Sequence, residues 1–393
     1  MSIEGEIRIE LQCQDDRVNQ VVINSTRPLN LPKIFHGKAV DELLTMIPML
    51  YSICATAQSS AAVKACRQAT GITADWRIHL LEQMLVNVET AREHLWRIMS
   101  DWSSHSETAL SRDHLATLAT LMSDARQACF QQGDSFTLQP LISFDAAAIE
   151  SIIQRIDQLC HEKIFAVSPA EWYQLEDQRA FNHWLDKCDT LAAALLRDLR
   201  DQTQSDSGDW GVEPLPSLDH RKVCRRLSET DADDFISAPD WQGQIYETGP
   251  LTRQLSHPLI EQLMQLYGQG VIPRLVARLL ELASIPAKLT RQLSRLKGTS
   301  DSIERHHDTE LSQQGLGEVE AARGRLFHRA VQQDGVIRQY QIVAPTEWNF
   351  HPRGVVCQGL KSLSAKHQKQ LMQQAELLIG AVDPCVGFQL ELR

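Results

Sequence analysis

The chain has 393 residues, of which 43% are hydrophobic, and a formal net charge of −11. This length and composition are typical of a globular protein with a large core, and the negative charge disfavours nucleic acid and an anionic membrane face as partners. The acidic first residues lack a secretion signal, and no uncharged apolar run reaches the roughly 18 residues of a membrane span. We therefore expect a cytoplasmic protein without direct membrane insertion.

Motifs for several common chemistries are missing from the sequence. The nine cysteines are scattered without a Cys-x-x-Cys pair, which indicates reduced thiols rather than disulfides. Gly315-Leu-Gly-Glu lacks the third glycine of a dinucleotide fingerprint, and neither a P-loop nor a GxSxG motif occurs. Nucleotide chemistry and serine hydrolysis therefore have no support.

A β-strand is predicted near the start of the chain. From Glu6 to Glu10 polar and apolar residues alternate, which places Ile7 and Ile9 on a buried face. Glu4 precedes this strand beside a glycine. There it either stays solvated or turns inward as a proton carrier, and the pattern leaves both readings open.

Long amphipathic helices are predicted for the next part of the chain. A helical stretch that starts at Val40 is interrupted at Pro48, and small residues then surround Cys54, which is either a structural cysteine or part of a narrow ligand site. The clearest helix spans Trp76–Trp102, because its apolar residues recur at steps of three and four. Similar stretches at 113–130, 146–163 and 169–201 complete a predicted helical bundle.

A further helical tract opens at Pro258, where Gly268, Gly270, Pro273 and Pro286 are expected to interrupt it. It follows a polar linker near 202–220.

The period of the sequence changes from helical to strand-like after Gly317. Two strand-like runs flank Asp334-Gly335, a favoured two-residue turn, and predict a β-hairpin that a proline-rich loop follows. A closing helix from Ser362 to Leu378 is expected to end with Gly380 as its C-cap. Pro384 should then hold Asp383 in an extended conformation, so that Cys385 follows a rigid backbone segment.

These elements predict a mainly α protein with small β elements (α+β). We expect a single domain, 1–393. Its parts are an N-terminal β segment (1–38), a helical bundle (39–300), a β-hairpin and loop (315–355), and a closing helix with an Asp-Pro-Cys tail (356–393).

Four separated segments carry a resemblance to one family. The start Ile3–Glu10, Ile53-Cys54, the block Glu320–Asn349 and the end Asp383-Pro-Cys385 resemble, in order, the large subunit of nickel–iron hydrogenases. In that family, Arg-Ile-Cys-Gly-x-Cys and Asp-Pro-Cys-x-x-Cys motifs supply four thiolates to nickel, and two of them bridge to an iron that carries two cyanides and a carbon monoxide. The resemblance implies a large-subunit-like helical bundle with an N-terminal strand and a β-hairpin in the C-terminal half.

The departures from the family's motifs concern nickel. Ser52 replaces the motif arginine, and Ala57 and Phe388 stand where the two bridging cysteines belong. Only Cys54 and Cys385 remain as metal ligands, too few for a four-sulfur nickel site. We expect no tail that a maturation protease would remove, since only five residues follow Phe388. We therefore expect neither nickel nor enzyme activity.

The residues that contact the iron ligands in that family are retained. The resemblance implies that Arg323 and Thr346 donate hydrogen bonds to the cyanides and that Asp383 orients Arg323. Glu4 matches the family's proton-relay glutamate, and without nickel it is a possible remnant of that relay.

The pattern is most similar to HupK/HoxV-type hydrogenase assembly proteins. The resemblance implies a maturation factor, a scaffold or carrier that holds the Fe(CN)2(CO) unit transiently before delivery. Its expected partners are hydrogenase maturation proteins and the hydrogenase large-subunit precursor. Two alternatives are a metal-free chaperone or decoy of the large subunit and a nickel-free structural subunit of a redox complex.

Overall fold

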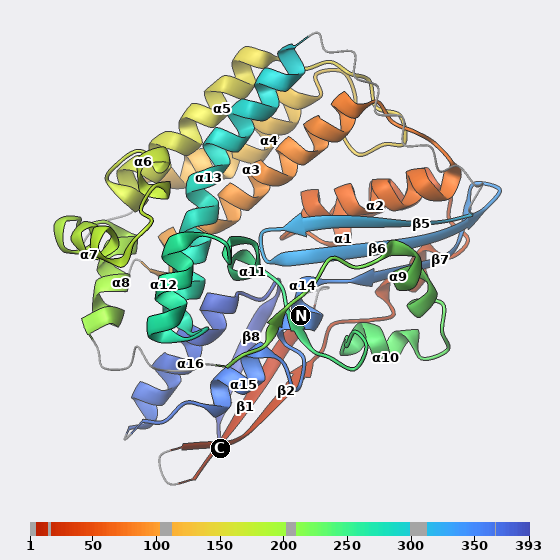
Figure 1. Cartoon of the computed structure of the whole chain (residues 1–393). Helices are drawn as coiled ribbons and strands as arrows, with labels where there is room; N and C mark the ends of the chain where they lie inside the picture. The colour runs from red at the N-terminus through yellow and green to blue at the C-terminus, as the bar shows by residue number, and fades with distance from the viewer. Residues whose placement is uncertain (1–4, 15–16, 103–111, 202–209, 299–312, 366) are drawn as a thin grey trace.

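The computed structural model describes all residues except 1–4, 15–16, 103–111, 202–209, 299–312 and 366. It has a bundle of long helices at one end, a three-stranded sheet beneath it and a second three-stranded sheet at the opposite end, near the C-terminus (Figure 1). The predicted class, mainly α with small β elements, is confirmed. Within the described residues, no helix combines the length and apolarity needed to cross a membrane.

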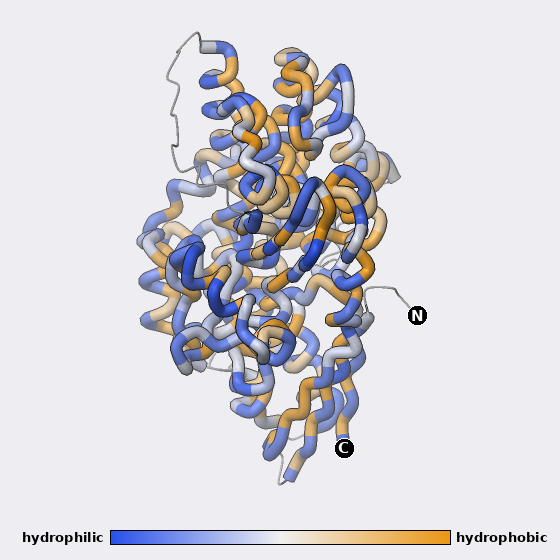
Figure 2. The backbone as a smooth tube through the Cα atoms, turned by 90° about the vertical axis from the view of Figure 1, so that its right-hand side faces the viewer, coloured by the Kyte–Doolittle hydropathy of each residue, from blue (hydrophilic) through white to orange (hydrophobic). Residues whose placement is uncertain are grey.

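Four long helices form the bundle. Helix α3 spans Trp76–Asp101 and packs against α4 (Arg112–Cys129) and α13 (Val271–Lys297), while α5 (Ala146–Leu159) closes the group. The predicted apolar face of α3 is buried throughout: Leu81, Met84, Val88, Ala91, Leu95, Ile98 and Trp102. Figure 2 shows the same amphipathic pattern as hydrophobic and hydrophilic residues that alternate along the helices.

Three predicted helix boundaries are wrong. The stretch 169–201 is three helices, α6 (Pro169–Tyr173), α7 (Gln178–Lys187) and α8 (Leu191–Asp201), because the side chains of Asp177 and Thr190 accept hydrogen bonds from the first turns of α7 and α8. Pro48 lies inside α1 (Val40–Leu50), and the break falls just before α2 (Ala55–Thr70).

The third error concerns α13. Gly268 and Gly270 do separate α12 (Pro258–Tyr267) from α13, but Pro273 and Pro286 lie within α13. Proline is tolerated in a first turn, where its missing N–H has no partner to lose. Pro286 is buried in the bundle, where packing outweighs one lost hydrogen bond.

The predicted N-terminal strand is confirmed and is the centre of a sheet. β1 (Glu6–Gln14) pairs with β2 (Arg17–Ser25) in antiparallel and with β8 (Gly387–Leu392) in parallel. Ile7 and Ile9 are fully buried, as expected. Strands β2 and β8 were not predicted. Since Phe388 pairs with Ile7 in this sheet, the end of the chain is fixed to its beginning.

The predicted hairpin is confirmed as part of a sheet with the order β5-β6-β7. β6 (Gly324–Gln333) and β7 (Val336–Val343) meet at Asp334-Gly335, both with positive φ. β5 (Gln314–Ala321) adds a third strand. Helix α2 covers one face of this sheet, and α9 (His220–Arg226), α10 (Ala232–Ser237) and α14 (Pro345–Asn349) surround a small core on the other face.

The C-terminal segment differs from the prediction in two ways. The expected loop after Ala344 contains α14, and α15 (Val355–Lys361) follows it. The closing helix α16 (Gln368–Val382) runs through Gly380 and ends at Asp383, whose φ of 64° and ψ of 93° are not extended. Pro384 excludes a helical ψ at Asp383, and positive φ is strained for a residue with a side chain, so neighbouring groups must hold it.

Two short strands form a separate two-stranded sheet. β3 (Glu213–Pro214) pairs with β4 (Tyr246–Glu247), and α11 (Pro250–Gln254) follows β4. Residues 202–209 of the predicted linker lie outside the described residues.

Candidate functional site

Two cysteines from opposite ends of the chain meet in the interior. Cys54 is the N-cap of α2, and Cys385 lies between α16 and β8. Both are buried, with 9% and 5% of their surface exposed, and their side chains are hydrogen-bonded to each other. The structure therefore brings both predicted metal ligands together. Among the described residues, no group of three or more His, Cys, Asp and Glu side chains forms a metal cluster.

The two thiols are not equivalent. The hydrogen bond from Cys54, the Arg323 guanidinium, the Thr346 hydroxyl and Arg27 lower the pKa of Cys385 to about 7 despite its burial. The same hydrogen bond and burial raise the pKa of Cys54 well above its usual value. Of the two, Cys385 therefore loses its proton first, and Cys54 keeps its proton beside the Cys385 thiolate.

Thr346 lies against Cys385. It is in the first turn of α14, and its hydroxyl accepts a hydrogen bond of 3.2 Å from the backbone N–H of Cys385. The hydroxyl is also hydrogen-bonded to the Cys385 sulfur, and this contact lowers the pKa of the thiol. Thr346 therefore orients both the backbone and the side chain of Cys385.

Arg323 lies in the turn between β5 and β6 and is buried between two carboxylates. Its Nε is 3.2 Å from Oδ2 of Asp383, and its Nη1 donates to Oε2 of Glu93 over 3.1 Å. Burial lowers the pKa of Arg323, but the charges of Asp383, Cys385 and Glu93 outweigh burial and raise it above its usual range. Arg323 therefore stays positively charged beside both sulfur atoms.

Three arginines converge on Asp383. Nε of Arg97 is 2.9 Å from Oδ1, and Arg323 and Arg278 lie 3.2 and 3.9 Å from Oδ2. Burial raises the pKa of Asp383, yet the three cations hold it below its usual value. Arg278 also donates to the carbonyl oxygens of Gly380 and Ala381. These contacts hold Asp383 at its positive φ and fix the chain just before Cys385.

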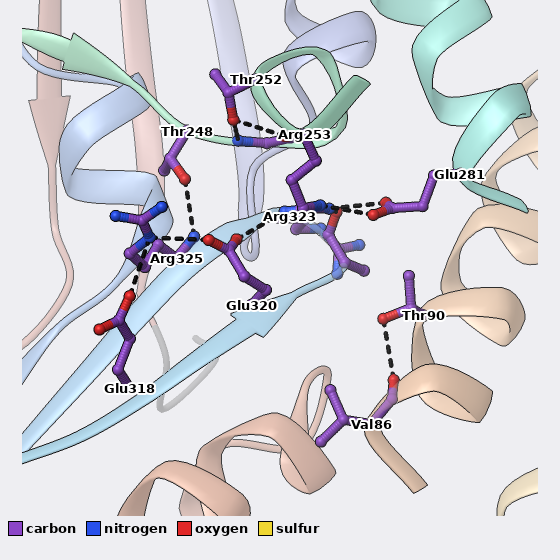
Figure 3. A network of polar contacts seen from close by, with 12 residues as sticks. Val86, Thr90, Thr248, Thr252, Arg253, Glu281, Glu318, Glu320, Arg323 and Arg325 are labelled. Carbon is purple, nitrogen blue, oxygen red and sulfur yellow. Dashed lines mark hydrogen bonds and ion pairs between the residues drawn. The ribbon is translucent and has the colours of Figure 1, made fainter. Parts of the chain in front are cut away.

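A network of ion pairs supports the turn that carries Arg323 (Figure 3). Arg253 donates to the carbonyl oxygen of Ala322, next to Arg323, and forms ion pairs with Glu281 and Glu320. Glu320 also binds Arg325 over 2.8 Å. Because Arg253 comes from α11 and Glu281 from α13, the network ties the β5–β6 turn to the helical bundle.

Several residues around the site were not found from the sequence. The carboxylate of Glu89 accepts hydrogen bonds of 2.7 and 2.9 Å from the backbone N–H groups of Thr56 and Ala57, at the N-terminus of α2. Burial raises its pKa to about 7. The sequence did contain a pattern that could have identified this residue. Glu89 and Glu93 lie one turn apart on a helix whose other buried residues are mainly apolar.

Arg27 and Glu347 form a second pair beside the thiols. Their Nη1 and Oε1 atoms are 2.5 Å apart, and both side chains are about nine-tenths buried. Burial lowers the pKa of Arg27, but the negative charges of Glu347 and the Cys385 thiolate outweigh burial and raise it. No local pattern marked Arg27, since it lies in the loop after β2 and meets Glu347 only in the folded protein.

A buried hydrogen-bond chain connects Cys54 with β6 and β7. Nε2 of Gln58 donates to the Cys54 sulfur over 3.7 Å, and Oε1 of Gln58 accepts from Nε2 of His328 over 2.7 Å. Nδ1 of His328 then accepts from the hydroxyl of Tyr340 over 2.5 Å. With this amide orientation every donor points toward Cys54, and His328 is a neutral imidazole.

His328 gives a pH prediction. Burial lowers its pKa from 6.5 to about 3, so below pH 6.5 the unfolded chain binds a proton that the folded protein does not. Stability is thus highest above pH 6.5 and falls as the pH drops. Between pH 6.5 and 4.5 we expect wild type to lose about 2 kcal/mol more than His328→Gln. Urea unfolding of both proteins measures this, and equal losses would contradict it.

The structure also shows the two positions at which the bridging cysteines are missing. Ala57 is fully buried in the first turn of α2, and Phe388 is part of β8, so neither position offers a donor for a metal. Glu4 lies outside the described residues. Two thiols with a cation and a hydroxyl beside them fit a single metal that brings its own ligands, and do not fit the four-thiolate nickel site.

Comparison with characterised proteins agrees with the motifs. The chain is 26% identical over 398 residues to the hydrogenase expression/formation protein HupV of Azotobacter chroococcum mcd 1, with 99% of this chain and 98% of the relative covered. It is 28% identical to HoxV of Cupriavidus necator, covering 94% and 92%, and 27% identical to HupK of Rhizobium leguminosarum bv. viciae, covering 99% and 97%. The resemblance to HupK/HoxV-type proteins is thereby confirmed.

The fold is also similar to those of solved hydrogenase structures. The reduced Ni-Fe-Se hydrogenase of D. vulgaris Hildenborough matches with a TM-score of 0.65 at 15% identity, over 95% of this chain and 94% of that chain. Residues 153–387 match the family described as nickel-dependent hydrogenase. These residues are more than half of the 393, and the chain therefore belongs to the nickel-dependent hydrogenase family.

Proposed function

We propose that this protein is a hydrogenase maturation factor that holds the Fe(CN)2(CO) unit before its delivery to the hydrogenase large subunit. The observation that carries the proposal is the buried thiol pair Cys54–Cys385, with Arg323 and Thr346 beside it. The names of its relatives, hydrogenase expression/formation proteins, support a maturation role and a function without catalysis. We further propose that it acts in the cytoplasm with the large-subunit precursor and other maturation proteins as partners.

The chemistry of the pair suits a cargo of this kind. The Cys385 thiolate, formed near neutral pH, supplies a ligand for low-spin iron, and Cys54 supplies a second one when it loses its proton. The guanidinium of Arg323 and the hydroxyl of Thr346 are donors suited to cyanide nitrogens. Without the two bridging thiolates, the hold on iron is weak enough for transfer.

Infrared spectroscopy tests the proposal directly. Protein purified without oxygen from hydrogenase-producing cells should show cyanide and carbonyl stretching bands. Cys54→Ala and Cys385→Ala should each lose these bands, because one thiolate cannot hold the unit through purification. Cys66→Ala is the matched control, since Cys66 is a fully buried thiol in the same helix as the Cys54 N-cap, and it should keep the bands.

Two results would contradict the proposal. Bands that persist in both thiol variants would place the unit elsewhere. An empty spectrum from wild type in cells that make active hydrogenase would favour a metal-free chaperone or decoy of the large subunit.

A further inference from the structure

A pocket of about 450 Å³ lies beside the thiol pair, between η1 (Leu31–Phe35), α10 and strand β7. Its floor and walls are formed by apolar and aromatic side chains, including Tyr51, Ile236 and Tyr340. The volume is in the range of small-molecule sites in proteins. None of the residues predicted from the sequence as site residues lines it.

The polar lining of the pocket carries a surplus of positive charge. Lys33 pairs with Asp233 over 3.0 Å, and Arg27 pairs with Glu347, so both acidic residues of the lining are already neutralised. Arg338 from β7 is exposed and has no hydrogen-bond or ion-pair partner among the described residues. The pocket therefore offers a free guanidinium to a ligand with negatively charged acceptors.

Two residues of the pocket lining interact with the thiol pair, one through its charge and one through a chain of hydrogen bonds. Arg27 lines the pocket, and its charge acts on both Cys54 and Cys385. Tyr340 also lines the pocket and starts the hydrogen-bond chain that ends at the Cys54 sulfur. Arg27 and Tyr340 thus link a ligand in the pocket to the thiols, by charge and by hydrogen bonds.

We propose that this pocket is the docking site at which the cyanide-bearing iron unit is received before it reaches Cys54 and Cys385. Arg338 and Arg27 donate hydrogen bonds to cyanide nitrogens, and the apolar walls accommodate the carbonyl ligand. Arg27 lines the pocket and its charge also acts on the thiols, so it attracts the negatively charged unit in both positions. This inference rests on the proposed function and adds the path by which the iron unit reaches the thiol pair.

Ferrocyanide is a probe for the pocket, because it presents cyanide nitrogens and needs no free thiol. Isothermal titration calorimetry on the purified full chain should show saturable binding of one equivalent. Arg338→Ala should weaken it about tenfold, the size expected for one charge-assisted hydrogen bond. Arg179→Ala, an exposed arginine on α7 away from the pocket, is the control and should bind as wild type does. Arg338 is exposed, so its removal leaves the fold intact.

Further arms of the experiment separate the pocket from the thiol site. Cys54→Ala and Cys385→Ala should keep ferrocyanide binding while they lose the infrared bands. Equal affinities of wild type and Arg338→Ala would overturn the inference, as would loss of ferrocyanide binding in Cys54→Ala. Sulfate that binds as tightly as ferrocyanide would also overturn it. If wild type shows no infrared bands but ferrocyanide behaves as expected, the proposed function fails and the pocket assignment stands.

Discussion

Asp383→Asn is expected to lower the free energy of unfolding by about 3–5 kcal/mol, because Asp383 is the carboxylate that, among the described residues, pairs with all three of Arg97, Arg278 and Arg323. Asparagine keeps the shape of aspartate and tolerates positive φ, so the loss reports the charge and not the backbone. Arg278 loses most, since its remaining partners among the described residues are two carbonyl oxygens. Urea unfolding followed by circular dichroism measures the change.

Asp101→Asn is the matched control for this substitution. Asp101 also pairs with Arg97, over 3.1 Å, but its side chain is 44% exposed. Exposed ion pairs contribute about 0–1 kcal/mol, and we expect a change within that range. Similar losses for both variants would show that burial among three arginines adds nothing to the strength of the Asp383 contacts.

The same substitution is expected to affect the site. Asp383 positions Arg323 and directly precedes the Pro384-Cys385 segment, so its loss frees both the guanidinium and the thiol. In protein that remains folded at low temperature, Asp383→Asn should weaken or shift the cyanide bands, whereas Asp101→Asn should leave them unchanged. Unaltered bands would contradict a positioning role for Asp383.

Gly317→Ala is expected to destabilise the protein by about 3 kcal/mol or more. A Cβ atom at this position would lie 1.9 Å from the carbonyl oxygen of Ala61 and 2.9 Å from the backbone nitrogen of Ala65. Both atoms belong to the backbone of α2, so no side-chain rotation relieves the contact. Helix α2 would have to move away from β5, and Cys54 at its N-terminus would move with it.

Gly387→Ala is the control for this prediction. Gly387 also lies in a strand, β8, but a Cβ atom there meets nothing within 4 Å. We expect a change within about 0.5 kcal/mol. Denaturation midpoints of the two variants measure the difference, and a stable Gly317→Ala protein would show that α2 does not depend on close contact with β5.

Sequence patterns predicted those elements whose stability depends on local periodicity. Ile7 and Ile9 alternate with polar residues, and the Trp76–Trp102 stretch repeats its apolar residues every three or four positions, so one buried face is evident in each case. The Asp334-Gly335 turn was evident too, because few residue pairs adopt its positive φ angles. The splitting of 169–201 was missed, since Asp177 and Thr190 cap helices inside one continuous periodic pattern.

Contacts between distant segments explain the remaining differences. Phe388 was identified only as a position that lacks a cysteine, and its place in β8 follows from pairing with β1 at the other end of the chain. The conformation of Asp383 was predicted from Pro384 alone, whereas arginines from α3, α13 and the β5–β6 turn determine it. A local rule for the residue before proline cannot include them.

For the candidate site, sequence motifs were enough to predict which chemical groups are present: two thiols, Arg323, Thr346 and Asp383, without the bridging cysteines at positions 57 and 388. Folding brings these groups together, forms the hydrogen bond between Cys54 and Cys385, and surrounds them with Arg27, Glu89 and Glu93. A motif specifies residue types but not the distances between them in the folded protein. Burial, pKa values and ion pairing arise from the distances between segments that only folding brings together.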